Sequence, residues 1–200
     1  MKGKYCSIII ISSVLILDQL SKIWIKTNMM LGEEIRITDW FIIHFVENPG
    51  MAFGLEFGGD IGKVALTVFR IIFVTFIFFY LRKAIINNRS KILISTMSFV
   101  LAGALGNIMD SIFYGVLFDD SIGKVASFLP EVGGYAPVLF GKVVDMLYFP
   151  LYKGFLPDWI PFFGGDYFVF FQPIFNIADT SISIGIGLFI LFQNKFKGAI

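Results

Sequence analysis

The chain has 200 residues, of which 56% are hydrophobic and only 16% are charged, whereas a soluble domain is typically about 25% charged. This composition excludes a disordered chain, a collagen-like fibre, a disulfide scaffold and an ordinary soluble enzyme, and it predicts an integral membrane protein with one domain over residues 1–200. The net charge of +1 gives no sign of a nucleic-acid partner, and the single cysteine cannot form an internal disulfide.

Four stretches are long and apolar enough to cross a bilayer, whose core of roughly 30 Å needs about 20 helical residues. They cover about residues 5–24, 64–81, 92–113 and 173–192, and they leave two long connections at about 26–62 and 114–172. The first stretch is similar to a cleavable signal peptide, but no small-x-small cleavage site follows it. We therefore expect it to be retained as the first of four transmembrane helices.

Basic residues indicate the orientation of these spans. Three short segments at the ends of spans are basic and contain no Asp or Glu: Lys2 with Lys4, then Arg82, Lys83, Arg89 and Lys91, and finally Lys195 with Lys197. By the positive-inside rule, both termini and the link between spans two and three are cytoplasmic. The two long connections then lie on the outer face.

The first outer connection has the pattern of β-strands. Residues 34–38 alternate between polar and apolar, and residues 40–46 are rich in β-branched and aromatic side chains. Asn48, Pro49 and Gly50 form a turn signal, because proline presets φ and glycine permits positive φ. The second outer connection is rich in Gly, Pro and aromatic residues, and aromatic rings are suited to the headgroup level of a membrane.

Polar pairs interrupt three of the spans, although a charged side chain in hydrocarbon costs roughly 2.5–3.5 kcal/mol. They are Asp18 with Lys22, Asn107 with Asp110, and Asn176 with Asp179, and each pair has the spacing of one helix face. The pairs come late in the spans that leave toward the outside and early in the one that enters from it. We therefore expect them to meet near the outer interface, where Asn48 and Asp145 of the outer connections can join them.

Two carboxylates near a dry interface are suited to peptide hydrolysis by water. One acid retains a proton while the other stays charged, so the pair can act as general acid and general base. A metal site is not indicated, because His44 is the sole histidine and Cys6 the sole cysteine. No serine lies in a GxSxG motif that would indicate a serine hydrolase.

These polar residues lie in five blocks that resemble, in the same order, those of the lipoprotein signal peptidases (signal peptidase II). The blocks are Asp18-Gln19-Leu20-Ser21-Lys22, Asn48-Pro49-Gly50-Met51-Ala52-Phe53-Gly54, Gly103-Ala104-Leu105-Gly106-Asn107-Ile108-Met109-Asp110, Val143-Val144-Asp145-Met146 and Phe175-Asn176-Ile177-Ala178-Asp179. One such block alone is weakly specific, whereas five in the family's order are specific.

The resemblance implies an all-α membrane protein with four transmembrane helices, both termini cytoplasmic, a small extracytoplasmic β-cradle and a short interfacial helix. It implies an aspartyl endopeptidase, with neither metal nor cofactor, that removes the signal peptide from prolipoproteins just before the diacylglyceryl-modified cysteine. The family's catalytic aspartates correspond to Asp145 and Asp179. The residues expected to bind substrate or support the site are Asp18, Lys22, Asn48, Gly50, Asn107, Asp110, Asn176 and Ala178.

The resemblance also implies where the protein works and what it meets. We expect a multi-pass protein of the bacterial cytoplasmic (inner) membrane with its active site at the extracytoplasmic face. Its expected partners are prolipoprotein substrates and membrane lipid, with no nucleic acid. The cyclic peptide globomycin is expected to inhibit it.

The chain departs from the family pattern in two places. Ser111 stands where the family has an arginine, so a cation is missing or is supplied by another residue, with Lys142 and Lys124 as candidates. About thirty residues, from Ile112 to Lys142, separate the third and fourth blocks, which lie close together in the family. This insertion is expected either to cover the active site or to contact lipid.

Other interpretations of the polar residues are open. Intramembrane acids also mark ion paths, so the chain could be a small proton-coupled transporter or channel, which would place polar groups near the midplane. It could instead be a structural subunit in which neither aspartate is essential. Asp18 and Lys22 suit pairing within one helix as well as substrate contact, and Arg70 in the second span is expected to pack against an acid or to snorkel outward.

Overall fold

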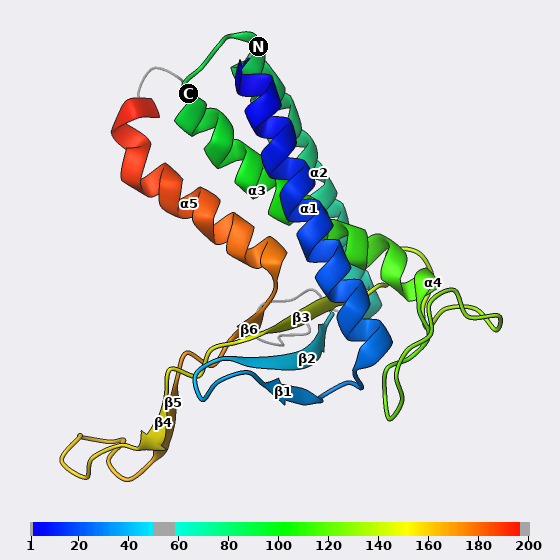
Figure 1. Ribbon diagram of the computed structural model, residues 1–200, viewed down its shortest axis with the longest axis vertical. Helices are drawn as coiled ribbons and strands as arrows, with labels where there is room; N and C mark the ends of the chain where they lie inside the picture. The colour runs from blue at the N-terminus through cyan, green and yellow to red at the C-terminus, as the bar shows by residue number, and fades with distance from the viewer. Residues whose placement is uncertain (1, 50–58, 197–200) are drawn as a thin grey trace.

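The computed structural model describes residues 2–49 and 59–196. This part of the chain holds four helices that are long and apolar enough to cross a membrane, which confirms the four predicted spans. They are α1 (Lys2–Asn28), α2 (Gly59–Ile86), α3 (Lys91–Met109) and α5 (Ile177–Phe196). α1 begins and α5 ends at the end of the bundle that lies away from the strands (Figure 1).

The third span does not end as a regular α-helix. It continues into a π-helical turn, η2 (Asp110–Tyr114), and a last short piece, α4 (Gly115–Leu117). A π-turn inserts an extra residue into a helix and is frequent at functional sites. Here it begins at Asp110, whose side chain is fully buried, so the irregularity coincides with one of the predicted polar positions.

The two long connections form an antiparallel sheet of four strands in the order β1-β2-β3-β6. The strands are β1 (Glu34–Arg36), β2 (Ile42–Asn48), β3 (Val143–Tyr148) and β6 (Ile174–Phe175). A separate hairpin of β4 (Tyr152–Phe155) and β5 (Tyr167–Phe170) extends from this sheet (Figure 1). Both strands predicted in the first connection are therefore present, with β1 shorter than predicted and β2 of the predicted length but two residues later.

The predicted fold class included a small β-cradle, and the structure has small antiparallel sheets, but the strands of the second connection, among them β3 with Asp145, were not predicted. Residues 143–146 of β3 are buried without alternation, and a strand covered on both faces lacks the period-2 signal. The fourth span starts four residues later than predicted because β6 pairs with Leu147 and Tyr148. The described parts of the two long connections contain no separate short interfacial helix.

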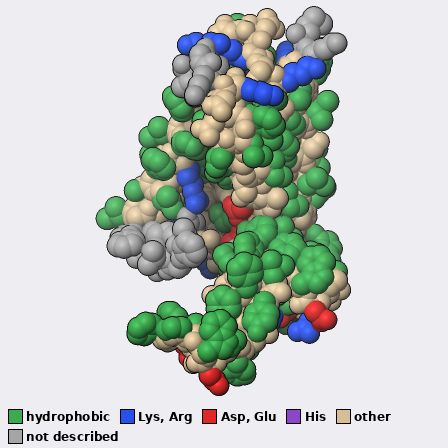
Figure 2. All heavy atoms as spheres, turned by 90° about the vertical axis from the view of Figure 1, so that its left-hand side faces the viewer, with side chains coloured by type: hydrophobic (Ala, Val, Ile, Leu, Met, Phe, Trp, Pro, Cys, Tyr) green, Lys and Arg blue, Asp and Glu red, His purple; other side chains and the backbone are tan. Residues whose placement is uncertain are grey.

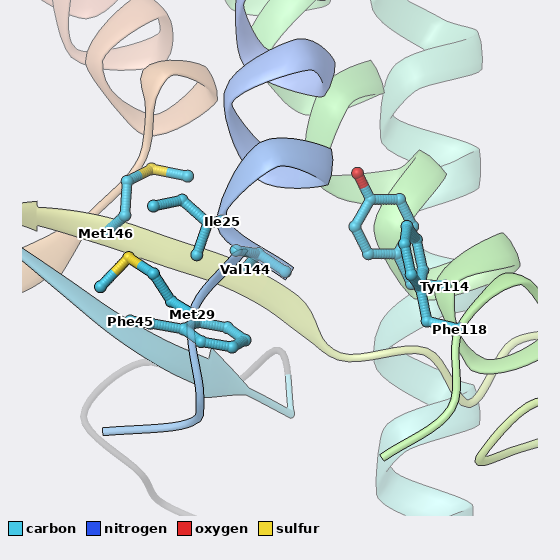
Figure 3. Close-up of a cluster of buried hydrophobic side chains, with 7 residues drawn as sticks. All are labelled: Ile25, Met29, Phe45, Tyr114, Phe118, Val144 and Met146. Carbon is cyan, nitrogen blue, oxygen red and sulfur yellow. The ribbon is translucent and has the colours of Figure 1, made fainter. Parts of the chain in front are cut away.

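A buried apolar cluster joins the bundle to the sheet. It consists of Ile25, Met29, Phe45, Tyr114, Phe118, Val144 and Met146. Figure 3 shows that these side chains come from the end of α1, from β2 and β3, and from the segment that follows α3. The cluster fixes β3, and therefore Asp145, against the ends of two helices.

Small residues let α3 approach its neighbours closely at the level of the polar residues. A Cβ atom on Gly106 would lie 2.6 Å from Asp18 Oδ2, and one on Gly103 would collide with the backbone oxygen of Ala178. Helices in membranes commonly pack through such small residues. The first turn of α5 and the polar face of α1 are thus both held against α3.

Candidate active site

Asp145 lies in the middle of β3, and only 4% of its surface is exposed. Its Oδ1 atom accepts a hydrogen bond from Asn176 Nδ2 at 2.7 Å, and its Oδ2 atom accepts one from Asn48 Nδ2 at 3.3 Å. Asn48 reaches it from the neighbouring strand, where Val46 is the register partner of Asp145. Two amide groups therefore hold this carboxyl group from β2 and from the start of α5.

Asp179 lies in the first turn of α5 and completes a capping box. Asn176 is the N-cap residue, and its Oδ1 atom accepts a hydrogen bond from the backbone N–H of Asp179 at 2.9 Å. In return Asp179 Oδ2 accepts from the backbone N–H of Asn176 at 3.3 Å. Asn107 Nδ2 donates to Asp179 Oδ1 at 2.7 Å. The Asp179 carboxyl group thus accepts hydrogen bonds from two N–H donors and lies in the first turn of a helix.

Asn176 connects the two predicted catalytic aspartates. Its fully buried side chain donates to Asp145, to Asn107 Oδ1 at 3.1 Å and to the backbone oxygen of Val144 at 3.3 Å, while its amide oxygen caps the turn that carries Asp179. One side chain therefore sets the positions of both carboxyl groups, which we call the aspartate pair.

A buried ionic cluster lies behind the aspartate pair. Lys22 Nζ is 2.9 Å from Asp18 and 2.7 Å from Asp110, and all three side chains are fully buried. Lys22 also donates to Asn107 Oδ1 at 3.0 Å. Asp18 Oδ1 accepts from the backbone N–H of Ala178 at 2.9 Å. The cluster therefore holds Asn107 and the first turn of α5, and it contacts the aspartate pair through them.

The structure brings together nine of the ten residues expected from the sequence, and the tenth, Gly50, lies outside the described residues. It adds Gln19, which was recognised as polar but not assigned to the site. Gln19 Nε2 donates to Asp110 at 2.9 Å and to Asp18 at 3.0 Å, and its Oε1 atom accepts from Tyr114 at 3.2 Å. A polar residue next to Asp18 in an apolar span was the signal for this role.

Two cations, one on α1 and one on α2, interact electrostatically with the aspartate pair. Lys22 of α1 interacts electrostatically with Asp145, and Arg70 of α2 does so with Asp179 and Asp145. The two lysines considered as replacements for the missing arginine lie elsewhere. Lys142 pairs with Glu47, and Lys124 forms a partly exposed pair with Asp119.

The surroundings of Asp145 favour its protonated form. Burial, followed by the negative charge of Asp179, raises the pKa of the Asp145 carboxyl group to about 7. The hydrogen bond from Asn48, the charge of Lys22 and the hydrogen bond from Asn176 oppose this rise. A carboxyl group that stays protonated near neutral pH can donate a proton to a developing oxyanion.

The site is open on one side of the molecule. Figure 2 shows acidic side chains in a hollow between the helices and the strands, on the face presented by α5 and the β4–β5 hairpin. Apolar side chains surround the region below this hollow (Figure 2). Within residues 2–49 and 59–196, no group of three or more His, Cys, Asp or Glu side chains is arranged to hold a metal ion.

Comparison with known proteins shows the family to which the chain is similar. The family model described as signal peptidase (SPase) II matches residues 10–194. A lipoprotein signal peptidase of Porphyromonas gingivalis is 48% identical over 192 residues, which cover 95% of this chain and 83% of the relative. One of Amoebophilus asiaticus is 39% identical over 180 residues, which cover 88% and 72%.

A solved structure shares the fold. A bacterial membrane enzyme determined by the in meso method superposes with a TM-score of 0.59 at 27% identity, covering 96% of this chain and 88% of that one. The family match extends over almost the whole chain. The chain therefore belongs to the signal peptidase II family and is an aspartic-type hydrolase of that kind.

Proposed function

We propose that this protein cleaves the signal peptide from prolipoproteins, just before the diacylglyceryl-modified cysteine, by attack of a water molecule between Asp145 and Asp179. The observation that carries the proposal is the shared contact with Asn176, which donates to one carboxyl group and caps the turn that bears the other. Family membership supplies the substrate class. The geometry supports different roles for the two acids, one as general base and the other as general acid.

Asp179 is the base and Asp145 the acid in this mechanism. Asp179, which accepts hydrogen bonds from Asn107 and from the backbone N–H of Asn176, takes a proton from the attacking water. Asp145 gives its proton to the carbonyl oxygen of the scissile peptide, which forms a tetrahedral diol. Asp179 then transfers its proton to the leaving amide nitrogen while Asp145 recovers one from a hydroxyl group of the diol, so both acids return to their starting states.

The proposed orientation places the sheet and the site at the outer face of the bacterial cytoplasmic membrane, with both termini in the cytoplasm. The basic ends of the spans support this orientation through the positive-inside rule. The β4–β5 hairpin exposes Tyr152, Phe155, Tyr167 and Phe170, between 51% and 70% of each residue. Aromatic side chains of this kind suit the headgroup layer. The hairpin would therefore lie in this layer beside the hollow, and the substrate would enter the hollow from the membrane.

The polar residues do not favour a transporter. They gather where the helices meet the sheet, whereas a transporter is expected to bind its ion near the midplane between repeated halves. Globomycin is expected to occupy the same hollow and to compete with the lipopeptide substrate. Competition kinetics with this inhibitor would test whether the hollow is the substrate site.

The proposal is tested with purified protein and a diacylglyceryl-modified prolipoprotein in detergent. Asp145→Asn and Asp179→Asn should each abolish cleavage, because each removes one of the two proton carriers, while circular dichroism shows intact helices. Asp39→Asn is the matched control, since the side chain of Asp39 is 99% exposed. Near-normal turnover by either pair variant, or loss of turnover on adding a chelator, would overturn the proposal.

A further inference from the structure

A second buried ionic cluster lies on the other side of β2 from Asn48 and is not explained by the proposed chemistry. Lys26 Nζ lies 2.5 Å from Glu47 Oε1, and the two side chains are 0% and 3% exposed. Ser121 Oγ contacts both of them, at 3.0 Å from Lys26 and 3.2 Å from Glu47. Lys142 Nζ lies 3.1 Å from the second oxygen, Glu47 Oε2. Lys26 and Glu47 belong to α1 and β2, whereas Ser121 and Lys142 belong to the insertion.

Aromatic rings surround the ammonium group of Lys26. Lys26 Nζ lies 5.0–5.9 Å from the ring centres of Phe45, Phe118 and Tyr135. The hydroxyl group of Tyr135 accepts a hydrogen bond from the backbone N–H of Lys142 at 2.7 Å. Such cation–π contacts gain strength when the cation is desolvated. The insertion therefore packs against α1 and β2. From the sequence alone, it was expected either to cover the active site or to contact lipid.

The charges in this cluster depend on one another. Burial alone would raise the pKa of Glu47, but the charges and hydrogen bonds of Lys26 and Lys142 hold it below its usual range. Removal of a partner from a buried ion pair is costly, because it leaves an uncompensated charge. Ser121 and Lys142, whose side chain is 33% exposed, both contact Glu47 and so hold the segment from Ser121 to Lys142 on β2.

β2 carries this constraint to the site. Glu47 is followed directly by Asn48, whose Nδ2 atom donates to Asp145, and Glu47 itself is the register partner of Val144. A shift of Glu47 along or away from β3 would therefore move Asn48 relative to the carboxyl group that it contacts. We propose that the insertion, through Ser121 and Lys142 on Glu47, positions Asn48 for its hydrogen bond to Asp145.

This inference rests on the proposed function, but its test separates the two. Lys142→Met and Ser121→Ala each remove one contact between the insertion and Glu47, and they leave the Lys26–Glu47 pair in place. Lys124→Met is the matched control, because Lys124 is on the same insertion, in a pair whose side chains are 55% and 20% exposed. Lys142→Arg keeps the positive charge and should retain the activity that Lys142→Met loses. All variants are compared at matched folded fraction, measured by size-exclusion chromatography and thermal shift.

We expect Lys142→Met to lower kcat by about tenfold with KM unchanged, since small displacements of a catalytic group have effects of this order. The alkaline limb of the pH–rate profile should move to higher pH, because the hydrogen bond from Asn48 lowers the pKa of Asp145. The other charged groups that act on Asp145 are Asp179, Lys22 and Arg70, and Lys142→Met leaves them unchanged. Ser121→Ala should shift both quantities in the same direction.

A readout independent of turnover completes the test. The carbonyl stretching band of protonated Asp145, identified by difference infrared spectra against Asp145→Asn, gives the titration of this group directly. Its midpoint should rise in Lys142→Met and remain at the wild-type value in Lys124→Met. A wild-type midpoint and pH profile in Lys142→Met, or an effect on KM alone, would overturn the positioning role. Cleavage by Asp145→Asn would instead overturn the proposed function.

Discussion

Replacement of Asn176 by alanine gives the most informative perturbation of the site. The substitution removes the 2.7 Å hydrogen bond to Asp145 and the N-cap that accepts from the backbone N–H of Asp179. A hydrogen bond between neutral groups contributes about 1 kcal/mol, and one to a charged group about 1.5–3 kcal/mol. Asp145 becomes charged when it donates its proton, so the bond from Asn176 strengthens in the transition state.

The difference, about 0.5–2 kcal/mol, is stabilisation present only in the transition state, so its loss should lower kcat by about two- to thirtyfold. The loss of the N-cap should also reduce the free energy of unfolding by about 1 kcal/mol. Steady-state cleavage of a fluorogenic lipopeptide measures the first quantity, and thermal unfolding in detergent measures the second. The alkaline limb of the pH–rate profile should move upward, because a donor that lowers the pKa of Asp145 is gone.

The control is Asn28→Ala, since Asn28 is exposed and its amide donates to Trp24 and Thr27 of its own helix. The reasoning would be refuted if Asn176→Ala lost stability but kept the wild-type kcat and pH profile. Asn176 would then be a helix cap without influence on the proton of Asp145.

Three further variants test other parts of the account. Since the pKa of Asp145 is raised to about 7, the folded state binds one more proton than the unfolded state between about pH 4 and 7. The free energy of unfolding therefore falls as pH rises through this window. Asp145→Asn should remove this fall, which thermal scans from pH 4 to 8 measure. Arg70→Gln removes a positive charge that acts on both members of the aspartate pair, so kcat should fall by about tenfold and the alkaline limb should move upward. Gly106→Ala places a Cβ atom 2.6 Å from Asp18 Oδ2 and should lower the free energy of unfolding by about 1–3 kcal/mol, whereas Gly187→Ala, where a Cβ meets nothing within 4 Å, should not.

Each of these variants has an outcome that would contradict it. A pH-dependent loss of stability that persists in Asp145→Asn would assign the proton to another group. Arg36→Gln is the control for Arg70, because the side chain of Arg36 is 67% exposed, and equal kinetics of the two arginine variants would exclude an effect of Arg70 on the site. Equal unfolding of Gly106→Ala and Gly187→Ala would mean that α1 and α3 separate without cost.

The polar residues of the spans could be predicted from the sequence because the membrane makes them exceptional. Asp18, Lys22, Asn107 and Asp110 stand in otherwise apolar helices, and their spacing put each pair on one face. The opposite directions of successive spans then predicted that they meet at one level. The observed contacts of Lys22 with both acids and with Asn107 follow this pattern.

The parts that depend on tertiary packing could not be predicted in the same way. β3 is covered on both faces and therefore gives no alternation, so the strand that carries Asp145 had no local signal. The ionic cluster of Lys26 and Glu47 had none either, because each residue alone has the appearance of an ordinary charged residue in a connection between spans. Only the pairing of β2 with β3 and the return of the insertion bring these groups together.

The central claim is that the two acids act on one water molecule and one peptide bond. An experimental structure with a lipopeptide inhibitor that carries a hydroxyl group in place of the scissile carbonyl tests it most directly. The account predicts that carboxyl oxygens of Asp145 and Asp179 both lie within hydrogen-bond distance of that hydroxyl group, with Asn176 still bound to Asp145. A hydroxyl group that contacts only one of the two acids, or neither, would contradict it.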